Sequence, residues 1–289
     1  MRYYTYFPGC SAEASAVAYG LSTEAVGRAL EMDLIELEDW NCCGSTPYGS
    51  LNELESICIS TRNLALAEKR GLDLVTPCSA CNIALNKANS YLREYAPLRR
   101  QVEESLAAAD LEYRGGVRVR HLVDVLLNDV GIEDLGSKVK RSLRGLKVAP
   151  YYGCQLVRPS LGFDDPESPR SLDLLTESLG AEAVPFPLKS RCCGGSLILA
   201  EEDLALGLMG KLLANAKENG AQCLVTPCPL CQTNLDAYQR KVNSKFKTNY
   251  DLPVLFITQL IGVALGLEPK ALGLGKNIVS PMKLLAPYL

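Results

Sequence analysis

The stretch Leu74-Val75-Thr76-Pro77-Cys78-Ser79-Ala80-Cys81 decides how the chain is interpreted, because most of it occurs twice. Its first five residues recur letter for letter at Leu224-Val225-Thr226-Pro227-Cys228, and the second copy also ends on a cysteine, Cys231. A short apolar run that stops at proline predicts a buried strand, since proline has no N–H to give to the sheet. Each copy therefore predicts a strand followed by a C-x-x-C step.

Further cysteines lie upstream of both copies at matching distances. The adjacent pair Cys42-Cys43 and its counterpart Cys192-Cys193 lie 150 positions apart, as do the two C-x-x-C steps. The two patterns read C-x31-CC-x34-C-x2-C from Cys10 and C-x37-CC-x34-C-x2-C from Cys154. Two such matched sets indicate an internal duplication.

Short apolar runs alternate with helical patterns in both halves. Strands are expected at residues 3–7, 34–37, 72–76, 147–152, 183–186, 223–226 and 254–257, and helices at 14–31, 51–69, 168–179 and 197–219. Ser168 followed by Pro169 is typical of a helix start. Alternation of this kind implies parallel sheets with right-handed crossovers. We predict an α/β fold of two pseudo-symmetric halves, residues 1–143 and 144–289, each a parallel sheet flanked by helices.

The cysteines follow the expected strands. Ligand sites in open α/β sheets gather outside the carboxyl ends of the strands, so both cysteine sets are expected there. Cys81 and Cys231 would then lie in the first turn of a helix, where free N–H groups and the helix dipole stabilise negatively charged sulfur. Gly44 and Gly194 follow the adjacent cysteines and are expected to let the backbone turn closely around inorganic sulfide.

Composition and charge exclude several classes of protein. The 289 residues carry a formal net charge of −3, whereas nucleic-acid binding needs a basic surface. No apolar run reaches the roughly 20 residues that cross a bilayer, and the first residues do not resemble a signal peptide. We therefore expect a cytoplasmic protein without membrane insertion. Its twelve cysteines should then stay reduced and bind metal instead of forming disulfides.

Iron–sulfur clusters explain the cysteines better than zinc. A structural zinc ion takes four ligands, whereas each half repeats five cysteines, two of them adjacent. The ferredoxin run C-x2-C-x2-C-x3-C is absent, so ordinary relay clusters are not indicated. Zinc in one or both motifs stays open as the alternative. Cys58 and Cys223 lie outside both sets and are expected to act as small buried apolar residues.

The double pattern resembles the cysteine-rich CCG domain pair, and in particular the B-type subunit of heterodisulfide reductase. The similarity covers nearly the whole chain and includes the stretches 6–10, 39–46 and 163–167. It implies two [4Fe-4S] clusters of the non-cubane type. It assigns one cluster to Cys10, Cys42, Cys43, Cys78 and Cys81, and the other to Cys154, Cys192, Cys193, Cys228 and Cys231.

The resemblance also implies a function. The chain would be the catalytic subunit of a heterodisulfide reductase complex, an oxidoreductase acting on sulfur groups, which cleaves or forms a disulfide-type S–S bond between the two clusters. Its expected partners are the iron–sulfur (C-type) and flavin-bearing (A-type) subunits of such a complex, and a small disulfide or carrier-bound sulfur. The alternatives are a sulfur-oxidising relative acting on lipoate-carried sulfur, and an electron-transfer or scaffold subunit that holds zinc.

No catalytic residue is expected beyond the cysteines, because the chain has one histidine and conventional Cys–His catalysis would have little to use. Lys189 and Arg191 stand beside the second cysteine pair, where they would bind an anionic substrate tail, offset cluster charge or be solvated. Gln155 follows Cys154 where relatives often carry histidine, which would alter the second site. His121 is either a structural residue or one that shapes the surroundings of the first cluster.

Overall fold

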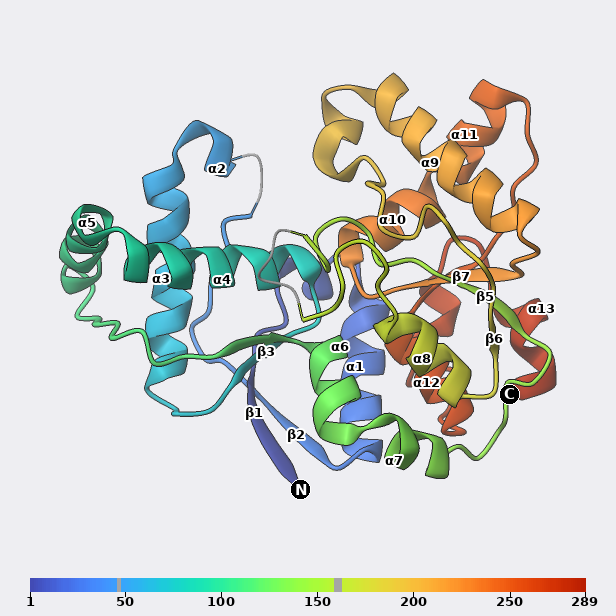
Figure 1. Ribbon diagram of the computed structural model, residues 1–289, viewed down its shortest axis with the longest axis horizontal. Coiled ribbons are helices and arrows are strands. Elements are labelled where there is room, and N and C mark those ends of the chain that lie inside the picture. Colours follow the sequence, from blue (N-terminus) through green and yellow to red (C-terminus); the bar gives the residue numbers. More distant parts are fainter. Residues whose placement is uncertain (46–47, 159–162) are drawn as a thin grey trace.

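Two four-stranded parallel sheets form the framework of the protein (Figure 1). The computed structural model describes residues 1–45, 48–158 and 163–289. The first sheet has the order β2-β1-β3-β4 and the second the order β6-β5-β7-β8. Their strands are β1 Arg2–Tyr6, β2 Met32–Glu36, β3 Leu74–Thr76, β4 Val119–His121, β5 Lys147–Pro150, β6 Glu182–Ala183, β7 Cys223–Thr226 and β8 Val254–Phe256. The predicted α/β architecture of two similar halves is confirmed.

Some strands differ from the expectation. The second-half strands β5 and β6 end early because Pro150 and Pro185 interrupt the hydrogen-bond ladder. β4 was not expected as a strand, since it carries Arg120 and His121 and has no apolar run. It pairs in register with β3, and β8 pairs with β7 in the same register, so the two edges are equivalent. Thr46, which closes the sequence stretch 39–46, lies outside the described residues.

Helices cover both faces of each sheet. The outer helices are α2 Tyr48–Leu51, α3 Glu53–Glu68, α4 Ser79–Glu94 and α5 Ala96–Ala107 in the first half, and α9 Glu202–Glu218, α10 Pro229–Ala237 and α11 Gln239–Phe246 in the second. The inner helices are α1 Val17–Ala29, α6 Leu122–Val125, α7 Ile132–Ser137, α8 Ser171–Ser178 and α12 Ile257–Ala264. Short elements are η1 Cys10–Glu13, the π-helix η2 Leu126–Val130, η3 Gly195–Leu199, η4 Leu274–Lys276, α13 Met282–Leu285 and η5 Ala286–Tyr288.

The start of α8 differs from the prediction at Ser168. The carboxylate of Asp165 accepts the backbone N–H of Ser168, and the carboxylate of Asp164 accepts those of Arg170 and Ser171. These two acidic side chains hold the segment in a loop, so the helix begins only at Ser171. Among the described helices, none combines the length and the apolar character that crossing a bilayer requires.

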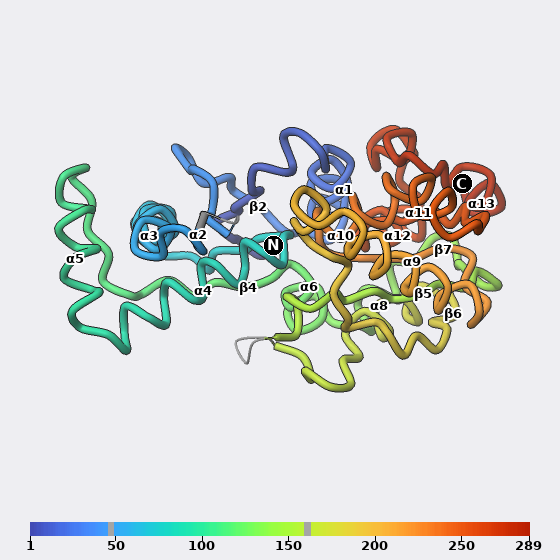
Figure 2. Tube along the Cα trace, turned by 90° about the horizontal axis from the view of Figure 1, so that it is seen from above, coloured from blue at the N-terminus to red at the C-terminus, as the bar shows by residue number. Residues whose placement is uncertain are grey.

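The inner helices pack across the boundary between the halves. α1 of the first half packs on α12 of the second, and α6 of the first half packs on α8 of the second (Figures 1 and 2). The hydroxyls of Ser22 and Thr258 meet at 2.6 Å in the first of these contacts. Val75 and Val225 point into one core shared by both halves, whereas the preceding leucines point into separate outer cores. The two sheets are therefore joined by a common interior.

Candidate metal centre

Both cysteine sets lie where the strand order of their sheet reverses. In the first sheet β2 lies on one side of β1, and the next strand along the chain, β3, lies on the other side. Ligands bind outside the carboxyl ends of the strands at such a switch in strand order. Cys10 opens η1 after β1, and Cys78 directly precedes α4 as its N-cap residue. In the second half Cys154 follows β5, and Cys228 is the N-cap residue of α10. This is the placement that the sequence predicts.

The thiols of the first set contact one another. Hydrogen bonds from the thiols of Cys42 and Cys81 lower the pKa of Cys43 to about 3. Cys81 also bonds to Cys78, and the charge of Cys10 contributes to the raised pKa of Cys42. The five cysteines of the first set are therefore linked through neighbouring pairs, and within the adjacent pair the thiolate form is favoured at Cys43 and disfavoured at Cys42.

The second set repeats this arrangement. Hydrogen bonds from Cys154 and Cys193 lower the pKa of Cys192 to about 2. The sulfur atoms of Cys193 and Cys231 lie 3.6 Å apart. The backbone N–H groups of Gly194 and Gly195 donate to the sulfurs of Cys192 and Cys193 at 3.3 and 3.4 Å. Such N–H groups stabilise negative charge on sulfur.

The two sets meet at their C-x-x-C steps. Hydrogen bonds to its sulfur, first from Cys231 and then from Cys78 of the other half, hold the pKa of Cys228 well below its usual range. The pKa of Cys78 is correspondingly raised, chiefly by the same bond to Cys228. The contact between Cys78 and Cys228, called the junction below, joins the ten cysteines into one continuous group.

Glycine backbone passes close to the sulfurs in both halves. Gly9 and Gly153 have φ of +76° and +67°, and a Cβ there would lie 3.0 Å from the sulfurs of Cys81 and Cys231. The close approaches of Gly44 and Gly194 are instead to Ser56 of α3 and Ala205 of α9. The glycines that leave room beside sulfur are thus the ones before Cys10 and Cys154.

This donor set suits a thiolate-bound metal group. Soft thiolate ligands select iron–sulfur clusters or zinc. Among the described residues, no group of three or more His, Cys, Asp or Glu side chains is arranged to hold a metal ion as it stands. The fit therefore rests on the all-sulfur chemistry of the two sets and on the room that Gly9 and Gly153 leave beside them.

Lys189 and Arg191 differ in whether their charged groups already have partners within the structure. The ammonium of Lys189 bonds to both carboxylate oxygens of Asp173, at 3.0 and 3.2 Å, and lies 5.1 Å from the ring centre of Tyr152. Arg191 is exposed, and its backbone carbonyl accepts the hydroxyl of Tyr151. In the described part of the chain its guanidinium has no hydrogen bond or ion pair, so Arg191 is the more available cation.

Gln155 and His121 both lie where the halves meet. Gln155 lines a 240 Å³ hollow together with Gly44, Ser45 and Lys87 of the first half. His121 caps α6 by accepting the backbone N–H of Val123 at 3.0 Å, which is a structural role. Burial lowers the pKa of His121 to about 4, and the charge of Cys228 and hydrogen bonds to the backbone of Pro227 and Pro77 oppose this shift.

Two polar residues near the sulfurs were not expected from the sequence. The amide of Asn234 donates to the carbonyl of Gly195 at 2.9 Å and lies 3.6 Å from the sulfur of Cys193. Tyr19 is buried, and burial and then interactions with Tyr6, Cys78 and Cys228 raise its pKa. A comparison of the repeats position by position would have found them, because Ala84 and Phe163 stand at the matching positions.

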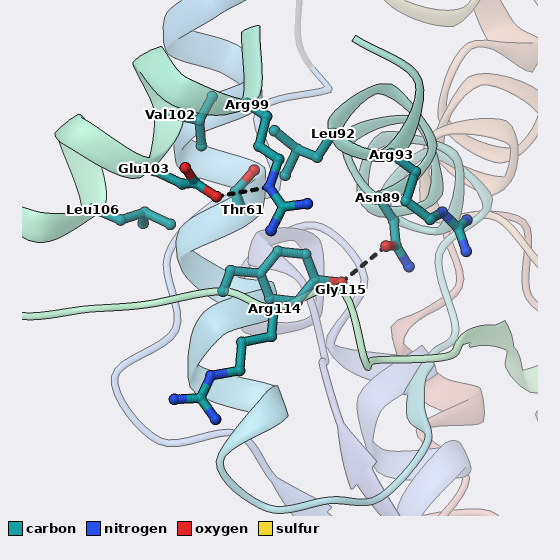
Figure 3. A pocket seen from close by; sticks show the side chains of 11 residues that line it. Thr61, Asn89, Leu92, Arg93, Arg99, Val102, Glu103, Leu106, Arg114 and Gly115 are labelled. Carbon is teal, nitrogen blue, oxygen red and sulfur yellow. Dashed lines mark hydrogen bonds and ion pairs between the residues drawn. The ribbon is translucent and has the colours of Figure 1, made fainter. Parts of the chain in front are cut away.

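A separate cavity lies between α3, α4 and α5, and none of its lining residues is a cysteine (Figure 3). Its volume is 20 Å³, enough for about one water molecule. Around it, Arg99 pairs with Glu103 (Figure 3), and the hydroxyl of Tyr113 donates to the side-chain oxygen of Asn89. The cavity is a small gap in the packing and no candidate for the functional site.

The fold and the site together define an α/β protein with a duplicated cysteine-rich domain. The family model "CCG: Cysteine-rich domain" matches residues 4–86 and 148–236. The chain therefore belongs to the CCG cysteine-rich domain family, and it is related along nearly its whole length to the B-type subunit of heterodisulfide reductase.

Two curated proteins and one crystal structure are similar to nearly the whole chain. It is 38% identical to the 8-methylmenaquinol:fumarate reductase membrane anchor subunit of Wolinella succinogenes, over 97% of this chain and 98% of that protein. It is 32% identical to the B-type subunit of the ferredoxin:CoB-CoM heterodisulfide reductase of Methanosarcina mazei, over 97% of this chain and 95% of that one. A crystal structure of a hypothetical protein from Helicobacter pylori matches with a TM-score of 0.80 at 17% identity, over 96% of this chain and 52% of that chain, which is a likeness of fold alone.

Proposed function

We propose that this chain is an iron–sulfur subunit of a heterodisulfide-reductase-type complex, and that its ten paired cysteines hold two non-cubane [4Fe-4S] clusters. The observation that supports this most directly is the junction of Cys78 and Cys228, which brings two five-cysteine sets together. A linear electron relay needs no matched pair of sites. Two equivalent sets at one place suit a reaction that takes two electrons at once.

The ligand roles follow the two sets. Cys10, Cys42, Cys43, Cys78 and Cys81 hold the first cluster, and Cys154, Cys192, Cys193, Cys228 and Cys231 hold the second. When bound, the clusters would supply one electron each to a disulfide, whose S–S bond breaks as two protons are taken up to give two thiols. The exposed Cys10 and Cys192 mark where the sets reach the surface. Arg191, exposed beside Cys192, binds an anionic substrate tail.

Partner subunits complete the proposal. This chain lacks the ferredoxin cysteine run, so electrons reach it from another protein. By analogy with the related complexes, a small iron–sulfur (C-type) subunit passes electrons from a flavin-bearing (A-type) subunit. The substrate is a small disulfide or sulfur held on a carrier, and a lipoate-bearing carrier would run the same chemistry in the oxidative direction.

Metal analysis tests this proposal. Anaerobically purified protein is expected to contain about eight irons and to lack stoichiometric zinc. Cys78→Ser and Cys228→Ser should each lower the iron content, whereas Cys58→Ser, outside both sets, should leave it unchanged. Reduced protein should then show a substrate-dependent EPR signal with a small disulfide. Stoichiometric zinc with little iron, or no signal and no turnover with any disulfide or persulfide, would overturn the proposal.

A second candidate function is that of a membrane-anchor subunit, as in the fumarate reductase of Wolinella succinogenes. Exposed leucines on three neighbouring elements of the second half favour it: Leu197 and Leu199 on η3, Leu204 on α9 and Leu230 on α10. Apolar side chains gathered beside a cysteine set are typical of a surface that meets lipid or a partner. This subunit would pass electrons between a membrane-bound donor and its complex.

Vesicle binding separates the two candidates. If the second is correct, the protein should float with vesicles of phosphatidylcholine and phosphatidylglycerol, and Leu199→Glu should reduce the bound fraction. Leu51→Glu is the matched control, because Leu51 of the first half is exposed to the same extent, 84% against 85% for Leu199. No flotation of the wild-type protein at low salt would contradict membrane anchoring through these leucines.

A further inference from the structure

The edge strand β2 leaves one side of its backbone without a partner strand. β2 ends the first sheet and pairs with β1 alone in the described part of the chain. The N–H of Leu37, just after β2, donates to the carbonyl of Tyr6 at 2.8 Å, and backbone groups alternate in direction along a strand. Leu34 and Glu36 therefore turn their N–H and C=O groups away from β1. A row of such free groups is a template for an added strand.

The second half blocks the matching edge. β6 has two residues, against five in β2, and stops before Pro185. Ile35 and Pro185 each precede the adjacent cysteines of their half by seven residues, so proline stands where the first half has a strand residue. Short strands and prolines at an edge prevent pairing with other chains. Since the repeat also folds with a blocked edge, the longer free edge of β2 is not a requirement of the fold.

A hollow of 430 Å³, called the acidic hollow below, lies at the carboxyl end of β2. Leu37 and Trp40 form part of its wall, and the exposed Cys10 of the first cysteine set lines it as well. A strand added to β2 would therefore have one end beside this set. The other lining residues are four acids: Glu13, Glu36, Glu38 and Asp39.

The acids of the hollow are only partly neutralised. Arg70 lies 3.1 Å from Glu38, and Arg62 lies 2.5 Å from Asp39. The other two acids, on η1 and at the end of β2, form no ion pair among the described residues, so negative charge remains in excess. The second half has other residues at the positions matching the acids at and after the end of β2: Phe186 for Glu36, Leu188 for Glu38 and Lys189 for Asp39.

We propose that the β2 edge and the acidic hollow together bind an extended, lysine- or arginine-bearing segment of a partner protein, which adds to the first sheet as a fifth strand. Its backbone pairs with Leu34 and Glu36, and its basic side chains meet the acids of the hollow. Under the proposed function this partner is the electron-donating subunit, placed beside Cys10. The name of the partner rests on the proposed function, whereas the surface and its chemistry do not.

A second copy of this chain does not fit the same surface. Its own β2 carries Asp33 and Glu36 and no basic residue. Pairing two such edges would set acids against acids, and like charges at a strand pair are destabilising. The charge of the surface therefore selects a partner of opposite sign.

Two variants of one residue separate the backbone from the charge. Glu36→Gln removes the carboxylate but keeps the N–H and an acceptor for the indole of Trp40, which donates to Glu36 at 3.0 Å. Glu36→Pro also removes the N–H on the free side, and proline is tolerated on edge strands where that side faces solvent. Glu104→Gln is the matched control, because Glu104 is exposed on α5 and does not line the hollow.

The probe is a labelled peptide of alternating lysine and valine, a pattern typical of a half-buried strand. Label anisotropy at low salt measures its affinity for the purified chain. Emission of Trp40, the one tryptophan in the sequence, shows whether the peptide reaches the hollow. Glu36→Gln should weaken binding about threefold and Glu36→Pro about tenfold or more, whereas Glu104→Gln should leave it unchanged.

Two control peptides test the same points on the wild-type protein. A peptide with glutamate in place of lysine should not bind, because its charge matches that of the hollow. A lysine peptide with N-methyl groups on consecutive central residues should not bind either, because it cannot donate to a strand edge. The second control decides the strand pairing even if Glu36→Pro does not fold.

The outcomes separate this inference from the proposed function. The inference is overturned by a wild-type chain that does not bind the lysine peptide, by equal binding of either control peptide, or by binding that leaves the emission of Trp40 unchanged. Equal affinities of Glu36→Gln and Glu36→Pro would also overturn it. Protein that lacks iron but binds the lysine peptide as expected would overturn the proposed function and support this inference.

Discussion

Arg120 of β4 and Leu255 of β8 occupy the same position in the two sheets, and each faces the shared core. Arg120 pairs in register with Val75, and Leu255 with Val225. Around Arg120 the first half gathers charge: its guanidinium lies 2.7 Å from Asp124 and 2.6 Å from Asp129. Around Leu255, which is fully buried, the second half is apolar.

The residues around Arg120 and Leu255 also differ between the two halves. Tyr4 and Asp73 of the first half extend the ionic group, the hydroxyl of Tyr4 donating to Asp129 at 2.6 Å. The matching positions in the second half are Val148 and Cys223, both buried in the same core. The same backbone arrangement therefore holds either a group of charged side chains or a group of apolar ones at these positions. All positions must change together, because a buried charge needs its partners.

Exchanging Arg120 for its counterpart gives the largest expected effect. Arg120→Leu should destabilise the protein by about 3 to 5 kcal/mol, because it leaves the carboxylates of Asp124 and Asp129 without their cation. Urea unfolding measures the loss. Arg118→Leu is the control, since Arg118 is 68% exposed and 3.8 Å from Asp73, and it should cost at most about 1 kcal/mol. Equal losses in the two variants would contradict the comparison.

The glycines beside the cysteines test whether the halves bind metal independently. Gly9→Ala should remove iron from the first set and Gly153→Ala from the second, because each new Cβ meets a cysteine sulfur. Each change also strains a positive φ, at about 1 to 3 kcal/mol. Gly71→Ala has the same strain, at φ +65°, with nothing within 4 Å, and should retain its iron. Loss of all iron from either variant would mean that the sites form together.

Asn234 and Ala84 offer a smaller test. Asn234→Ala gives the second half the residue of the first and leaves the carbonyl of Gly195 without its donor. We expect a loss of about 1 to 2 kcal/mol in thermal or urea unfolding, since one buried hydrogen bond is removed. The spectrum of the second site should change while that of the first stays the same. An unchanged stability would show that Asn234 makes no net contribution to the folded state.

The smallest expected effect concerns two helix starts. The side chain of Asn52 caps α3 by accepting the N–H of Glu55, whereas Glu201 gives α9 no such bond within the described structure. Asn52→Ala should cost about 1 kcal/mol, and Glu201→Asn should add up to about the same amount. Chemical denaturation of both variants measures these changes in the free energy of unfolding. A gain of stability in Asn52→Ala would contradict the role of the cap.

Repetition made much of the fold and the site predictable. The duplicated cysteine spacing, with a proline ending each strand before it, indicated both parallel sheets and the cysteines at the strand ends. β4 was missed because the partners of Arg120 come from three other segments, and no local pattern shows that its charge will be compensated. The pairing of α1 with α12 was also hidden, since an apolar helix face does not show which sheet it will cover.

The junction needed the structure for a similar reason. Matched spacing places each cysteine at its own sheet, but the contact of Cys78 with Cys228 depends on how two sheets are oriented. Tyr19 and His121 were present in the sequence without any motif around them. Matching the repeats position by position would have paired Tyr19 with Phe163, but the sequence alone does not show that the hydroxyl of Tyr19 is buried without a hydrogen-bond partner among the described residues.

The packing of the inner helices also bears on what one repeat could do alone. Since α1 packs on α12 and α8 on α6, a chain with one repeat alone would expose the apolar faces of its inner helices. Such a chain would cover these faces by pairing with a second copy as a two-fold symmetric homodimer. In the present chain the two halves take the place of the two copies, so residues such as Tyr19 and His121 can occur on one side alone.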